Sequence, residues 1–166
     1  MKAQHNTDVI ANPLDSVEDI FLGYDWDYDR SANDELVVHV SGEKCHYTMI
    51  FIWQKEFGAL QFSCLCDVAI PQNRSDEACQ AFQSINEQLW LGHFEMSGKP
   101  MTPRFRYTML FRHQDNESGT TQLNDLVDIA LAECERHYDI FSMLGTSTPI
   151  NDDVLFLELS GNIGQA

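Results

Sequence analysis

The sequence predicts a single α+β domain: a helix, a three-stranded antiparallel meander, a second helix, two strands and a third helix. Segments with strand-like alternation cluster along the chain instead of alternating singly with helices, which is the pattern of an antiparallel α+β sheet. A length of 166 residues suits one domain. We expect a flexible leader at residues 1–11, the domain at 12–144 and a C-terminal tail at 145–166.

The first helix has a clear beginning and end in the sequence. Asn12 can cap the free backbone N–H groups, and Pro13 is tolerated at the first helical position. Gly23 suits the C-terminal end. The apolar residues at helical spacing are Leu14, Val17, Ile20 and Phe21. A short amphipathic helix of about three turns is therefore expected.

The strands of the meander follow directly. Residues 24–29 alternate aromatic and acidic side chains, which is typical of a strand or of a turn at the sheet edge. Residues 35–40, 47–54 and 59–70 are rich in β-branched and aromatic side chains and are separated by turn residues. We expect these three segments to pair as consecutive antiparallel strands.

The second half of the chain adds two helices and two strands. The expected elements are a helix at 76–92, strands at 93–97 and 105–112, a polar turn at 113–119, and a helix at 121–144. An apolar run at 154–159 lies in the tail beyond a proline. The sequence leaves open whether this run packs on the domain, extends a partner's sheet or stays mobile.

The charge and cysteine content exclude several classes of partner. The formal net charge is -16, from 26 acidic and 10 basic residues. Such a field repels phosphate backbones and anionic lipids, so nucleic-acid and membrane binding are not expected, whereas a basic client would be attracted. Five cysteines without an export signal or a long apolar segment predict reduced thiols and a cytoplasmic location.

Neither a metal nor a cofactor is expected. Asp25, Asp27 and Asp29 resemble the start of a calcium loop, but Arg30 stands where that loop needs glycine and Leu36 where it needs an acid. Cys64 and Cys66 share one face of a strand among apolar residues, which favours core positions over a zinc site.

Catalysis is not expected either. The chain contains no nucleophile elbow, phosphate-binding glycine loop or zinc-protease motif. The alternative is a small-molecule-binding protein or unrecognised enzyme that uses Cys64, Cys66, His39 or His46 in a pocket.

Three arginines form the densest basic region of this acidic chain. Arg104, Arg106 and Arg112 lie in or beside the strand expected at 105–112. They predict either an anion-binding face or cross-strand pairing with the surplus acids, and pairing is the favoured interpretation.

Several segments resemble the YbjN family of bacterial sensory transduction regulators. The resemblance rests on Asn12-Pro13-Leu14, on Asp25-Trp26, on residues 84–95 and on residues 103–107. It covers residues 12–144 and implies a fold similar to that of type III secretion chaperones, which are small, acidic, commonly dimeric proteins that bind extended client segments. It implies no catalytic residues.

The resulting hypothesis is a non-enzymatic, chaperone-like or regulatory module that binds a protein partner. An apolar sheet face or an exposed edge would receive an extended client. The candidate contact residues are Tyr24, Trp26, Tyr28, Phe105, Tyr107, Met109 and Phe111, which are equally suited to the core. A homodimer is expected from the resemblance and from the long apolar third helix.

Overall fold

A computed structural model describes residues 12–111 and 116–146 of the chain. Six antiparallel strands form one sheet in the order β1-β2-β3-β4-β6-β5. The elements are α1 (Pro13–Tyr24), β1 (Asp27–Ala32), β2 (Glu35–Ser41), β3 (His46–Gln54), β4 (Ala59–Cys66), η1 (Gln72–Arg74), α2 (Ser75–Asn86), β5 (His93–Ser97), β6 (Thr102–Leu110) and α3 (Asn116–Gly145). The predicted α+β class is confirmed.

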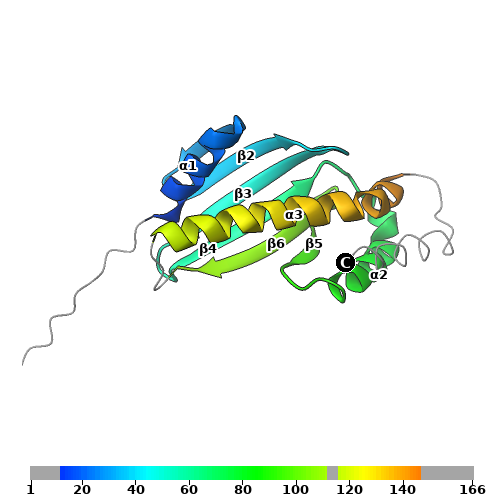
Figure 1. The fold of residues 1–166 in the computed structure, drawn as a ribbon. Helices are drawn as coiled ribbons and strands as arrows, with labels where there is room; N and C mark the ends of the chain where they lie inside the picture. The colour runs from blue at the N-terminus through cyan, green and yellow to red at the C-terminus, as the bar shows by residue number, and fades with distance from the viewer. Residues whose placement is uncertain (1–11, 112–115, 147–166) are drawn as a thin grey trace, which may run out of the picture.

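The three α-helices cover the same face of the sheet. In Figure 1, α1 and α3 lie in front of the strands, and α2 lies near the β5 end. Burial along the strands alternates accordingly, because every second side chain faces the helices. The core side of the sheet carries fully buried aromatic and aliphatic residues, among them Leu36, Val38, Met49, Phe51, Leu60, Phe62 and Phe105.

The opposite side of the sheet carries no helix of the described chain, and we call it the open face. Cross-strand register places His39, Thr48, Leu65 and Arg104 in one row across it. A second row contains Val37, Ile50, Ser63 and Arg106, and a third contains Glu35, Ile52, Gln61 and Thr108.

The sheet adds two features to the predicted meander. Residues 27–32 form a full strand, so four strands, and not three, run consecutively from β1 to β4. The sixth strand then lies between β4 and β5, so that β5 forms the far edge.

Helix boundaries also shift from the predicted ones. The Asn12 side-chain carbonyl accepts a hydrogen bond from the Leu14 N–H at 3.0 Å, as the capping pattern predicts. The second helix ends at Asn86, six residues earlier than predicted, and the third begins at Asn116, five residues earlier. The predicted leader at 1–11, the residue Arg112 and the apolar run at 154–159 lie outside the described residues.

Arg74 joins the end of the third helix to the start of the second. Its side chain is 6% exposed, and one guanidinium nitrogen donates to the carbonyls of Met143 at 2.8 Å and Thr146 at 2.9 Å. The last carbonyls of a helix have no intrahelical donor, so the guanidinium satisfies them and holds α3 against η1 and α2. It also pairs with Glu77 at 2.6 Å.

None of the helices in the described part of the chain combines the length and the apolar character that crossing a membrane requires.

Candidate partner-binding surface

An aromatic cluster lies where α1 ends and β1 begins. Asp25 caps α1 in the left-handed conformation, with φ 56°, and this turns the chain sharply from helix to strand. The Tyr24 and Trp26 rings then stack with centroids 4.8 Å apart, and Trp26 stacks on the buried Phe21 at 5.4 Å. The cluster is thus attached to the core at one end and open at the other.

The tyrosines of this cluster are the exposed members. Tyr24 is 43% exposed and Tyr28 is 37% exposed, whereas Trp26 is half-buried. The Tyr24 hydroxyl donates to the Asn124 side-chain carbonyl of α3 at 3.1 Å, which fixes the ring. Leu22, on the same helix end, is 67% exposed. Rigid, partly exposed aromatic rings of this kind suit a contact surface.

The strand beside this cluster is one of the two edge strands of the sheet. β1 pairs with β2 and with no other strand among the described residues. Register pairs Asp27 with His39 and Asp29 with Val37, so both aspartates are on the open face, while Tyr28 is opposite Val38 on the core side. The three aspartates of the suspected calcium loop therefore do not converge on one point, and no metal-binding group of three or more such residues exists within the described ranges.

The remaining four candidate contact residues have different positions. Phe105 is fully buried and Met109 is 8% exposed, both on the core side of β6. Tyr107 and Phe111 are half-buried and pack against the core, Phe111 meeting Trp53 edge-on at 6.1 Å. Phe105 and Met109 therefore belong to the core and are not part of a surface. The structure stacks Tyr24 on Trp26 and places Tyr28 on the adjoining strand β1, whereas Phe105, Tyr107 and Met109 lie on β6, beyond β4.

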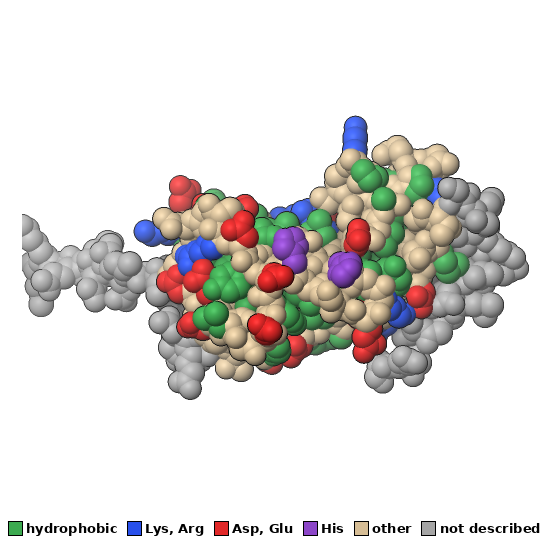
Figure 2. Space-filling model, turned by 90° about the horizontal axis from the view of Figure 1, so that it is seen from above, with side chains coloured by type: hydrophobic (Ala, Val, Ile, Leu, Met, Phe, Trp, Pro, Cys, Tyr) green, Lys and Arg blue, Asp and Glu red, His purple; other side chains and the backbone are tan. Residues whose placement is uncertain are grey.

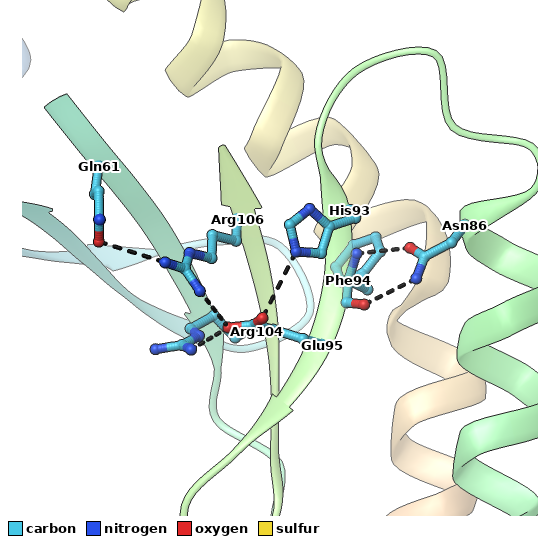
Figure 3. A network of polar contacts seen from close by, with 7 residues as sticks. All are labelled: Gln61, Asn86, His93, Phe94, Glu95, Arg104 and Arg106. Carbon is cyan, nitrogen blue, oxygen red and sulfur yellow. Dashed lines mark hydrogen bonds and ion pairs between the residues drawn. The ribbon is translucent and has the colours of Figure 1, made fainter. Parts of the chain in front are cut away.

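A cluster of charged side chains lies on the open face at the β5–β6 side, as Figure 3 shows. Glu95 pairs with Arg104, with Arg106 at 3.6 Å and with His93 at 3.6 Å. Arg106 also donates to the Gln61 side-chain carbonyl at 3.5 Å. Cross-strand pairing is thus the arrangement found for Arg104 and Arg106, with a single carboxylate shared among three basic side chains.

The environment of Glu95 favours its ionised form. Partial burial raises its pKa, but the hydrogen bond and positive charge of Arg104, together with Arg106 and His93, outweigh burial and leave the pKa of Glu95 below its ordinary value. Behind it, Asn86 at the end of α2 exchanges hydrogen bonds with the backbone of Phe94, at 2.7 and 2.9 Å. These bonds hold β5 in place beneath the cluster (Figure 3).

The histidines and cysteines of the alternative hypothesis lie on opposite sides of the sheet. Cys64 and Cys66 are buried on the core side, where they interact with the buried Cys134. Interaction with these two thiols, together with burial, raises the pKa of Cys134 well above its ordinary value. His39 and His46 are exposed on the open face. A backbone layer therefore separates the imidazoles from the thiols, so the four residues form no common pocket.

Two structural residues gave no sequence signal. Arg74 is a buried arginine in an irregular segment, and its role depends on the distant end of α3. Trp90 is 76% exposed although the helical stripe predicts it to be apolar core. For Trp90 the cause is the early end of α2, which removes residues 87–92 from the helix.

Together these features define an α+β protein with one helix-covered and one open sheet face, and with an aromatic cluster at a free edge strand. A sequence model of the YbjN family, described as "Putative bacterial sensory transduction regulator", matches residues 13–143, and the chain belongs to this family. The described fold is similar to a solved structure described as "Crystal structure of YbjN, a putative transcription regulator from E. coli". The TM-score is 0.51 at 8% identity, with 75% of this chain and 93% of that chain covered. No curated protein matched the sequence.

Proposed function

We propose that this chain is a non-enzymatic regulatory module that binds an extended segment of a partner protein along the free edge of β1. The observation that carries the proposal is an edge strand bordered by the partly exposed rings of Tyr24 and Tyr28. An added strand would gain main-chain hydrogen bonds from the edge, and the aromatic cluster would receive its alternate side chains. The family's description as a regulator supports a binding role.

The charge of this region favours a partner segment that is basic as well as apolar. Asp25, Asp27 and Asp29 are exposed along the edge, and the whole chain carries a net charge of -16. The nearest cation, Arg30, is already paired with Asp15 at 2.8 Å and with Glu18 at 3.2 Å on α1. Complementary charge would speed association and select basic segments. Figure 2, which looks down on the α1 side of the molecule, shows red acidic side chains between green hydrophobic ones.

Affinity purification with matched variants tests this proposal. The variant Tyr24→Ala/Tyr28→Ala removes the exposed rings and leaves Trp26 on Phe21, whereas the control Trp90→Ala removes an exposed ring far from β1. Suppose that a partner binds the wild type and the control, and that the double variant retains at least tenfold less of it. This result supports β1 as the site. Equal retention by all three proteins, or no partner above background at physiological salt, overturns it.

A further inference from the structure

The charges of the open face are separated across the sheet. Asp27 and Asp29 lie on β1 and Glu35 on β2, at one side of this face. Arg104 and Arg106 on β6 and His93 on β5 lie at the other side, with Glu95 as their shared acid. We call these two groups the acidic margin and the basic margin.

Between the margins the open face carries aliphatic and uncharged polar side chains. Its central residues on β2, β3 and β4 are the half-buried Val37, Thr48, Ile50, Ile52, Gln61, Ser63 and Leu65 and the exposed His39. At one end, Leu110 is 56% exposed beside Ala59. A face with a mixed aliphatic and polar centre and margins of opposite charge has the composition of a moderately polar protein interface.

The third helix offers no apolar surface on which a second copy of the chain could dimerise. The apolar residues of α3 pack onto the sheet of their own chain, with Leu126, Ala130, Ile140 and Phe141 all buried. The homodimer expected from the length of this helix therefore lacks a surface there. The open face is the large, uncovered surface among the described residues.

We propose that a second copy of this chain covers the open face, related by a two-fold axis that runs along the strands between β3 and β4. Rotation about this axis places β1 of one copy opposite β5 of the other, and β2 opposite β6. The acidic margin of each copy then faces the basic margin of its partner, twice in one dimer. An axis across the strands would instead place acid on acid, which electrostatic complementarity disfavours.

The size of the face agrees with this arrangement. Six strands about 4.8 Å apart, each contributing about seven residues at 3.4 Å, present an area of about 600 Å² before side-chain relief is included. A standard interface buries about 800 Å² per partner. Aligned packing of two sheets, about 10 Å apart, is also a common way to bury such faces. The main-chain edge of β1 stays accessible for an added strand, whereas Asp27 and Asp29 face the second copy in this arrangement.

Charge reversal on one margin at a time tests the arrangement. The acidic-margin variant is Asp27→Lys/Asp29→Lys, and the basic-margin variant is His93→Glu/Arg106→Glu, which leaves the Arg104–Glu95 pair in place. In a homodimer of either variant, margins with the same sign of charge would face each other at both contacts. The dimer dissociation constant of each variant is therefore expected to be at least tenfold higher than that of the wild type. An equimolar mixture has opposite charges at both contacts and is expected to form a one-to-one heterodimer.

Sedimentation equilibrium at 0.15 M salt and native mass spectrometry give the readout. Control variants with reversed charges elsewhere are Asp125→Lys/Asp128→Lys on the exposed side of α3 and Lys99→Glu on the β5–β6 turn, and both should remain dimeric. The wild type is measured from about millimolar concentration downwards in 100-fold dilution steps. The proposal is overturned if the wild type is monomeric throughout this range, or if the margin variants stay dimeric. Monomeric variants that do not associate with each other exclude the predicted pairing of margins, while circular dichroism verifies that both are folded.

Discussion

Gly92 provides the sharpest test of how the chain connects its second helix to the sheet. Its φ is +66°, a conformation that a side chain makes costly, by about 1 kcal/mol. A Cβ at this position would also come within 2.8 Å of Cε2 and 2.9 Å of Cε1 of Phe105, and closer still to Cζ. Because the Phe105 ring is fully buried, it has little room to move.

The two costs combine to a large destabilisation in Gly92→Ala. Overpacking of a filled core adds about 1–3 kcal/mol to the backbone strain, so the free energy of unfolding should fall by about 3 kcal/mol. For a chain of this size that lowers Tm by about 6–12 °C. Urea unfolding followed by circular dichroism measures the change, and the m-value should stay constant.

Two further variants separate the causes. Gly23→Ala is the control, because an added Cβ there meets nothing within 4 Å and an alanine in α1 should be neutral or stabilise by up to about 1 kcal/mol. The double variant Gly92→Ala/Phe105→Leu relieves the steric overlap, so its cost should be at least about 1 kcal/mol less than the sum of the two single costs. Additive costs, or a loss below about 1 kcal/mol in Gly92→Ala, would refute the reasoning.

Three other predictions follow from buried and paired polar groups. Arg74→Met should lower the free energy of unfolding by about 2–4 kcal/mol in urea titrations, since it removes the buried guanidinium hydrogen bonds to the Met143 and Thr146 carbonyls, and Arg74→Lys should recover only part of the loss. Glu95→Gln should lower the free energy of unfolding by about 1 kcal/mol near pH 7. Because the folded pKa of Glu95 is lowered, this contribution is complete above its unfolded pKa and disappears as the pH falls through the folded value. The free energies of unfolding of wild type and variant should therefore converge in acid, and a difference that stays constant with pH would contradict the ion pairs. Thiol labelling followed by mass spectrometry should modify the exposed Cys79 first and the buried Cys134, whose pKa is raised, only on unfolding; early modification of Cys134 would show that the core opens.

Local sequence signals predicted most of the elements correctly. The Asn12 cap with Pro13 marked the start of the first helix, because capping depends on residues that are adjacent in the chain. The alternation in residues 35–66 predicted strands and also which side chains face the core. The same local rule misplaced the end of the second helix. Residues 87–92 continue the apolar spacing, but they form the connection between α2, which ends at Asn86, and β5, which begins at His93.

The candidate surface could be predicted only in part. Tyr24, Trp26 and Tyr28 were recognised as a group because they alternate along five residues, and the structure stacks the first two on each other. Phe105 and Met109 follow the same alternation, yet they lie under the helices. Alternation identifies two faces of a strand but does not say how far a helix covers either one.

By itself, the sequence determined the α+β class, the helix start, the inward and outward sides of the central strands and the strongly acidic charge. All of these depend on composition or on neighbours within a few residues. The tertiary structure alone decided that β6 lies between β4 and β5, that Arg74 closes the end of α3, and that the charged margins stand on opposite sides of one open face. These features join residues far apart in the chain, and the register that joins them is set by long-range packing of the whole sheet against its helices.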